Sequence, residues 1–194
     1  MAYVSRGFVP QCDLNINTGL TKLFYIPSGD SNDIALYDIV KASTSGSTTV
    51  NYGIPAGLPG AVRITSIDDI PVGVVVGFIA DSSYLEQTYR TASTARVALV
   101  CYDPQVVLEA QEDNAGAATL GVSRIGTPVD VSIGAGVDTV TGTSSMQIGS
   151  GALAGSPGMF RLQQRSLDPS NAAIGGANTK WLVTFNVHQY KATT

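Results

Sequence analysis

The stretch Ala95–Asp113 constrains the fold most, because two different strand patterns meet there at a single break. Before the break both sets of alternating residues are apolar, which is typical of a central strand covered on both faces. After the break apolar and polar residues alternate, which is typical of a strand with one buried and one exposed face. Pro104 separates the patterns; it has no N–H for a strand ladder and it keeps Asp103 extended. The sequence therefore predicts two strands joined at a corner rather than a helix.

The most apolar run of the chain, Ile70–Ala80, lies just upstream and predicts a third strand of the same sheet core. Other short segments of strand-forming residues are bounded by turn residues. They are Leu23–Ile26, Ile34–Lys41 (where a helix is the alternative), Ala61–Ile67, Pro128–Ile133, Phe160–Arg165 and Trp181–His188. Together these segments predict an all-β fold, a compact barrel or sandwich of roughly eight to ten short strands with long Gly-, Ser- and Thr-rich loops.

One helix is predicted, over Asp81–Thr91, where Ser83 and Glu86 have the spacing of a capping box. The segment holds few apolar residues, so an irregular connection is the alternative.

Residues 1–22 lack periodicity and predict an N-terminal arm, followed by a single β-rich domain over residues 23–194. The arm nevertheless carries aromatic residues, and such a segment usually docks on something. Aromatic and guanidinium groups are enriched in interface hot spots, so Tyr3, Arg6 and Phe8 are the candidate partner contacts. The alternative is a tail folded back on its own domain.

The composition excludes several classes of function. Charged residues make up 13% of the chain, against ~25% in ordinary soluble domains. So low a charge content is typical of a surface that neighbouring molecules partly cover. A rigid secreted β-protein would have a similar composition. The net charge is -4 and no basic run occurs, so no nucleic-acid partner is expected. Ile70–Ala80 is too short to cross a membrane as a helix, and the N-terminus has no apolar signal core. Cys12 and Cys101 are expected to be buried thiols.

No catalytic, cofactor or metal site is predicted, and we expect no enzyme. The single histidine, His188, is expected on the wetter face of a strand, and one histidine with two distant cysteines cannot compose a zinc site. Asp30–Asp33 begins like a calcium loop but is better explained as a turn. Asp68 and Asp69 are adjacent, so on a strand they would point to opposite faces; a solvated turn is the better interpretation.

Short segments spread over nearly the whole chain carry a resemblance to a known family. They are Gly7–Pro10, Tyr25–Asp30, Gly73–Phe78, Asp103-Pro104 leading to Glu109–Asp113, Asp168–Asn171, Trp181–Val183 and Asn186–His188. In their order and spacing the chain resembles tailed-bacteriophage virion proteins, the head decoration or cement proteins. It departs from that pattern in the Ser/Thr-rich loops Ser43–Thr49 and Val137–Gly158.

The resemblance implies a structural virion protein without catalysis, bound in many copies to the outer surface of the capsid. Its partners would be the major capsid protein and further copies of itself, as a dimer or trimer, and it would stabilise the head against internal DNA pressure. An acidic chain is repelled by packaged DNA, which agrees with an outer location.

Two other classes stay open. One is a tail or fibre-base component, although fibres usually show repeats and this chain has none. The other is a carbohydrate-binding β-sandwich, which needs exposed aromatic residues on one face; Tyr84, Tyr89 and Tyr102 are available for it.

Overall fold

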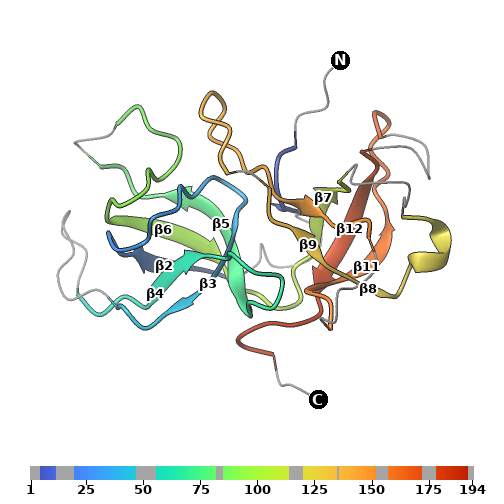
Figure 1. Ribbon diagram of the computed structural model, residues 1–194, viewed down its shortest axis with the longest axis horizontal. Coiled ribbons are helices and arrows are strands. Elements are labelled where there is room, and N and C mark those ends of the chain that lie inside the picture. The colour runs from blue at the N-terminus through green and yellow to red at the C-terminus, as the bar shows by residue number, and fades with distance from the viewer. Residues whose placement is uncertain are drawn as a thin grey trace.

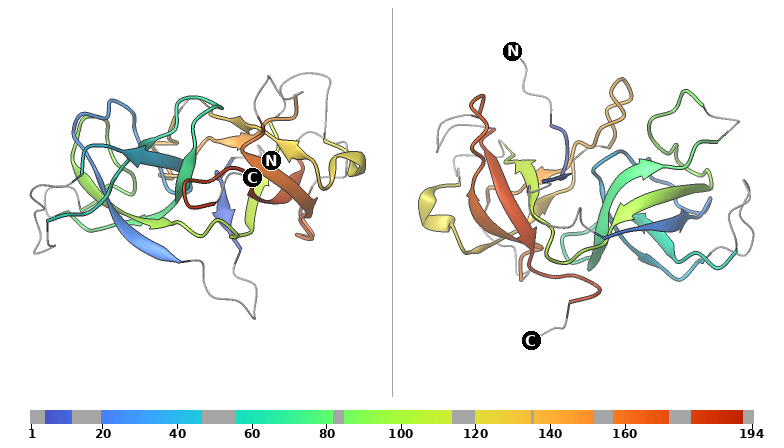
Figure 2. Two further views of the ribbon diagram at one scale, coloured as in Figure 1. Left: turned by 90° about the horizontal axis from the view of Figure 1, so that it is seen from below. Right: turned by 180° about the vertical axis from the view of Figure 1, so that it is seen from behind.

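The fold was analysed in a computed structural model, which describes residues 5–11, 20–46, 56–81, 85–113, 120–134, 136–151, 157–171 and 178–191. In these ranges the chain forms twelve strands and a single 3-10 turn, η1 (Val122–Arg124), so the predicted all-β class is confirmed. The strands build a closed barrel and a five-stranded sheet, which lie side by side along the long axis of the molecule (Figures 1 and 2).

The barrel contains five strands in the order β2-β4-β3-β5-β6. They are β2 (Thr21–Ile26), β3 (Ile39–Ser43), β4 (Gly60–Arg63), β5 (Pro71–Phe78) and β6 (Arg96–Cys101). All pairs are antiparallel except β2 with β4. Small and β-branched residues fill the interior, among them Val40, Val75 and Val100. Closure removes the exposed sheet edges that would otherwise pair with other chains.

The second sheet is antiparallel, with the order β1-β7-β12-β11-β8. Its strands are β1 (Val9–Pro10), β7 (Leu108–Gln111), β8 (Pro128–Val129), β11 (Phe160–Arg165) and β12 (Lys180–Phe185). The hairpin of β9 (Val131–Ser132) and β10 (Gln147–Ile148) lies against it. Alternate residues of the long strands are buried on one face, such as Trp181, Val183 and Phe185 on β12.

The corner at Asp103-Pro104 carries the chain from the barrel to the second sheet. Val106 donates its N–H to the Asp103 carbonyl over 3.2 Å, and Gln105 donates its N–H to the Asp103 carboxylate over 2.9 Å. The strands on either side are β6 and β7, as expected, but they belong to different sheets. The prediction that β5, β6 and β7 share one sheet core is therefore wrong, since only β5 and β6 are paired.

The N-terminal segment packs against the second sheet. Val9 pairs with Glu109 of β7, and the Phe8 ring stacks on Phe160 with 4.4 Å between the ring centroids. The predicted boundary at residue 22 falls inside β2, which begins at Thr21. Residues 5–11 thus occupy the edge of the sheet.

No helix forms over residues 85–91, so the helix predicted from Asp81 to Thr91 is wrong in its described part; Ser83 lies outside the described residues. The cause is Arg90, which has no exposed surface. Its guanidinium donates hydrogen bonds to four backbone carbonyls, those of Pro27, Asp30, Asn32 and Thr94. This segment is therefore held by the end of the barrel rather than by local helical bonds.

Cys101 is buried at the end of β6, as expected, whereas Cys12 lies outside the described residues. Among the described segments, none is a helix of the length and hydrophobicity needed to cross a membrane.

Candidate binding surface

The five-stranded sheet turns a mostly polar face away from the core. Because side chains alternate along a strand, the residues between the buried ones share this face. Those that are half-buried or exposed include Val9, Gln11, Glu109, Arg161, Gln163, Gln164, Lys180, Leu182 and Thr184. We call this surface the outer sheet face.

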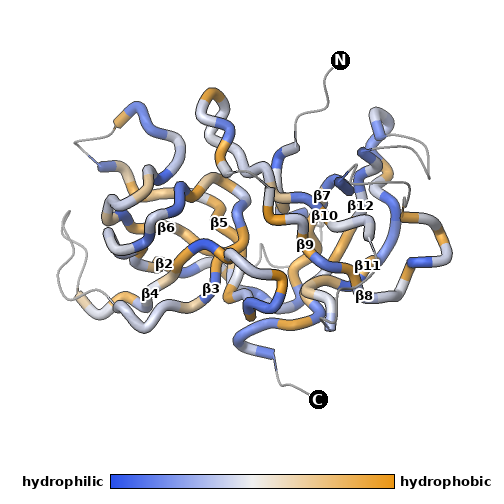
Figure 3. The backbone as a smooth tube through the Cα atoms, viewed as in Figure 1, coloured by the Kyte–Doolittle hydropathy of each residue, from blue (hydrophilic) through white to orange (hydrophobic). Residues whose placement is uncertain are grey.

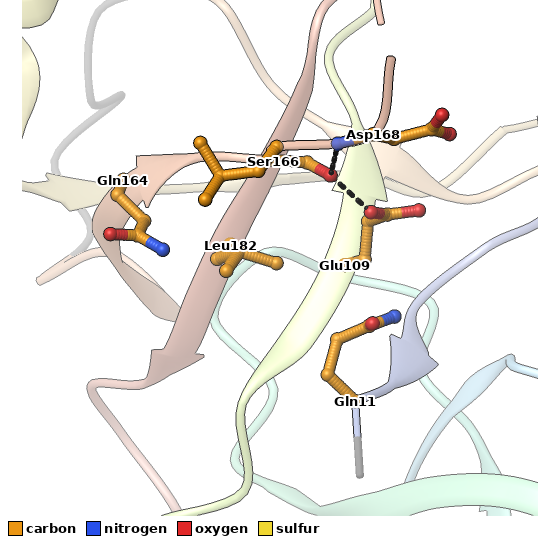
Figure 4. Close-up of a pocket in the computed structure, with 7 residues that line it drawn as sticks. Gln11, Glu109, Gln164, Ser166, Asp168 and Leu182 are labelled. Carbon is orange, nitrogen blue, oxygen red and sulfur yellow. Dashed lines mark hydrogen bonds between the residues drawn. The ribbon is translucent and has the colours of Figure 1, made fainter. Parts of the chain in front are cut away.

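A cavity of about 460 Å³ opens on the outer sheet face (Figure 4). Register places Leu182 of β12 between Glu109 of β7 and Gln164 of β11. The residues that line the cavity come from four segments and are Gln11, Glu109, Gln164, Ser166, Leu167, Asp168 and Leu182. We call it the Glu109 pocket.

Ser166 fixes the carboxylate of Glu109. β11 ends at Arg165, and the N–H of the next residue, Ser166, donates to the Lys180 carbonyl over 3.0 Å. This bond places the nearly buried Ser166 hydroxyl beside Glu109, to whose Oε2 it donates a hydrogen bond. The same hydroxyl accepts the Asp168 N–H over 3.3 Å. The carboxylate of Glu109 is therefore held at the wall of the pocket before any ligand arrives.

The two carboxylates of the pocket differ in how their charge is balanced. Asp168 accepts the Lys180 ammonium at 2.6 Å and the N–H and hydroxyl of Ser170 at 2.9 and 2.8 Å, and these bonds lower the pKa of Asp168. Glu109 forms no ion pair within the described residues. The pocket thus presents one uncompensated negative charge.

The structure does not bring the three predicted contact residues together on a surface. Tyr3 lies outside the described residues, and Arg6 is exposed. Phe8 has no exposed surface because it belongs to the core beneath the second sheet, where Phe160 covers it. As a candidate contact Phe8 is replaced by its neighbours Val9 and Gln11, whose side chains lie on the outer sheet face.

His188 does not lie on the wetter face of a strand, so this prediction is wrong. β12 ends at Phe185, and the alternation that it sets does not extend to His188. The imidazole is 3% exposed and packs against the rings of Phe185 and Tyr190, and its Nδ1 accepts the Tyr190 N–H over 3.1 Å. Burial lowers the pKa of His188 to about 4, so the ring is neutral at pH 7.

The acidic segments noted in the sequence form turns. The Asp30 carboxylate accepts the backbone N–H of Asn32 over 3.0 Å and lies 3.8 Å from the Arg90 guanidinium. The Asp69 carboxylate accepts the Lys41 ammonium at 2.7 Å and the N–H of Thr65 at 2.8 Å. Over the described ranges, no three His, Cys, Asp or Glu side chains are grouped so that they could hold a metal ion.

Apolar side chains also project from two neighbouring loops. Val140, at the turn of the hairpin of residues 137–144, is 91% exposed, and Leu85 is 75% exposed. The two loops touch, because Gly142 of the hairpin lies directly against Thr88. They project from the same side of the molecule, and the tip of the hairpin is hydrophobic (Figures 1, 2 and 3). This pair of loop tips is a second exposed surface, separate from the Glu109 pocket.

No protein-family model matches this chain, and no curated protein sequence matches it significantly. A functional assignment therefore rests on the residues and their geometry.

Proposed function

We propose that the protein is a structural component of a tailed-phage virion, a decoration or cement protein that binds the outer surface of the capsid in many copies. The observation that carries the proposal is the outer sheet face, a continuous, mostly polar surface on a rigid β-fold. The resemblance of the sequence to decoration proteins supports the same assignment.

Several polar side chains of this face are already engaged in hydrogen bonds. Arg161 donates to the Asn186 side chain over 3.1 Å and to the Gly126 carbonyl over 2.9 Å, and Gln163 donates to the Thr184 hydroxyl over 2.8 Å. Side chains that are ordered before binding lose less conformational entropy in a complex. The face is thus suited to docking on a rigid, repetitive surface such as a protein shell.

The sheet edges are protected against pairing with other copies. Both edge strands of the second sheet are two residues long and contain a proline, Pro10 in β1 and Pro128 in β8. Proline has no N–H to donate to an added strand, and short edge strands are poor templates. This protection favours a protein that stays soluble at the high local concentration on a virion.

A decoration protein acts by mass action on a shell that has already assembled. A ligand that binds the shell but not dispersed subunits stabilises it by RT ln(1 + [L]/Kd), which is about 2.7 kcal/mol per site at a hundredfold excess over Kd. Summed over many sites, this stabilisation would make the shell resist internal DNA pressure. Avidity would strengthen binding further if the protein self-associates as a dimer or trimer.

The test is to produce particles that lack the protein and to follow DNA release on heating. We expect such particles to assemble but to release DNA at a lower temperature, and purified protein to restore the resistance when added back. Failure to assemble would identify a primary shell or scaffold component. Unchanged stability with lost infectivity would favour a tail or fibre-base component, and saturable glycan binding would favour the carbohydrate-binding alternative.

A further inference from the structure

The Glu109 pocket combines an uncompensated carboxylate with an apolar floor. Glu109 has no cationic partner in the described part of the chain, whereas the nearby Asp168 is neutralised by Lys180. Of the two Glu109 carboxylate oxygens, Oε2 accepts the Ser166 hydroxyl and Oε1 makes no hydrogen bond to a described residue. The floor is Leu182, and Leu167, which is 83% exposed, lies at the rim.

We infer that this pocket receives an arginine side chain of the protein on which the outer sheet face docks. The identity of that partner, a capsid subunit, rests on the proposed function; the chemistry of the pocket does not. The negative charge of Glu109 attracts a cation. The two leucines can contact the aliphatic stem of a long basic side chain, which packs on apolar surface while its charged end stays solvated.

The distribution of acceptors favours arginine over lysine. Gln164 and Glu109 flank Leu182 on neighbouring strands, and Gln11 lines the pocket from the β1 segment. A guanidinium has five N–H donors in a planar fork and can satisfy a carboxylate and an amide carbonyl together, whereas an ammonium is a compact point charge. The wall is also preorganised, because Ser166 holds Glu109 in place.

The pocket is tested directly by titrating N-acetyl-L-argininamide into the isotope-labelled protein and recording NMR spectra. N-acetyl-L-citrullinamide, which is nearly isosteric but uncharged, and N-acetyl-L-lysinamide are the matched ligands. We expect saturable shifts in the side-chain amides of Gln11 and Gln164 and in the methyl groups of Leu182, with binding of the arginine analogue only. Equal shifts with the citrulline or the lysine analogue, or no saturable shift, would overturn the assignment.

Two variants test whether binding of the arginine analogue depends on the Glu109 carboxylate. Glu109→Gln removes the charge but keeps an acceptor for Ser166. The NMR signals of its residues outside the pocket show whether the variant is folded. Glu86→Gln removes the same charge from an exposed position of a distant loop. The first variant should lose binding of the arginine analogue and weaken binding to particles that lack the protein by about tenfold or more, as expected for losing a charged hydrogen-bond partner. The second should change neither.

The arginine pocket and the capsid assignment can be refuted separately. If the parent protein binds particles but Glu109→Gln binds them equally well, the arginine pocket is wrong and the decoration function stands. If the arginine analogue binds at the pocket but the protein does not bind particles, the capsid assignment is wrong and the pocket stands.

Discussion

The indole N–H of Trp181 donates a hydrogen bond of 2.9 Å to Oε2 of Glu112, a carboxyl group with no exposed surface. The same oxygen accepts the N–H of Leu120 over 3.2 Å, whereas Oε1 has no hydrogen-bond partner. Burial raises the pKa of Glu112, and the neighbouring charge of Asp113 acts in the same direction, against the two hydrogen bonds. Relative to the unfolded chain, the fold therefore shifts the equilibrium of Glu112 towards the protonated carboxyl.

Glu112→Gln should leave the protein at least as stable as the parent at pH 7, because the amide keeps an acceptor for Trp181 and carries no buried charge. In the parent, the pKa of Glu112 in the folded state lies above its ordinary value of 4.5. The contribution of Glu112 to the free energy of unfolding should thus fall as pH rises from 4.5 through the folded pKa, and the variant should lack this part of the pH dependence.

Trp181 is the only tryptophan of the chain, so its fluorescence follows both the unfolding in urea and the titration of its partner. Glu109→Gln, which alters a carboxylate on the outer sheet face, is the control and should retain the parent profile. Identical pH profiles for the parent and Glu112→Gln would contradict a role of Glu112.

Phe8→Ala should reduce the free energy of unfolding by about 3–5 kcal/mol, because it removes a fully buried ring that stacks on Phe160. Arg6→Ala, two residues earlier at an exposed position, should change it by less than about 0.5 kcal/mol. Urea unfolding of both variants is the measurement. A similar, small effect of both would mean that residues 5–11 do not contribute to the core.

Much of the strand pattern was predictable because alternation is a local property. β5, β6 and β11 lie within the segments that the sequence indicated, and β12 begins one residue before its predicted segment. The assignment of strands to sheets was not predictable, since it depends on pairings between distant residues. β7 follows β6 directly in the chain, yet its partners are β1 and β12.

The wrong predictions share one physical cause, which is tertiary contact overriding a local pattern. The capping-box spacing near Glu86 yields no helix over residues 85–91, because Arg90 is bonded to carbonyls at the end of the barrel. The alternation of apolar and polar residues after Pro104 indicates a strand with one exposed face, and Glu109 lies on that face. The hydroxyl that fixes it comes from Ser166, which is 57 positions away, and no spacing rule indicates that contact.

Asp38→Ala should destabilise the protein by about 3–5 kcal/mol, because it leaves the Arg63 guanidinium buried without its carboxylate. Asp38 also accepts the Ala35 N–H over 2.9 Å, and Arg63 donates to the Ile133 carbonyl over 2.9 Å, so the pair links the barrel to the residue that directly follows β9. Lys41→Ala breaks a partly exposed ion pair and should cost less than about 1 kcal/mol. If thermal unfolding shows comparable losses of stability for Asp38→Ala and Lys41→Ala, burial does not determine how much an ion pair contributes.

The contribution of His188 to the stability should be lost as pH falls from 6.5 to about 4. The pKa of His188 in the folded state, about 4, lies below its ordinary value of 6.5, so the unfolded chain takes up a proton first as the pH falls. The neutral ring makes its full contribution to the free energy of unfolding above pH 6.5. This contribution decreases between pH 6.5 and about 4, by up to about 1.4 kcal/mol per pH unit. An NMR titration of the imidazole measures the pKa, and a value near 6.5 would contradict the burial argument. His188→Gln should flatten the stability profile in the same window.

Gly142→Ala should destabilise the protein more than Gly126→Ala, although both glycines have a positive φ, +70° and +82°. Any L-residue is strained in this region, by roughly 1–2 kcal/mol, so that cost is common to both variants. A Cβ at Gly126 would meet no heavy atom within 4 Å, whereas a Cβ at Gly142 would overlap the Thr88 side chain. The second variant must therefore also push apart the two loops that carry Val140 and Leu85.

Hydrogen exchange locates that effect, since Leu36 donates its N–H to the Gly142 carbonyl over 3.0 Å. We expect faster exchange of the Leu36 amide in Gly142→Ala and an unchanged rate in Gly126→Ala. Adding Thr88→Ala to Gly142→Ala removes the nearest overlapping atom and should recover part of the lost stability. If the two single variants lose equal stability, or if Thr88→Ala gives no recovery, the hairpin of residues 137–144 is not held against the loop of Thr88, and the two tips do not form one rigid surface.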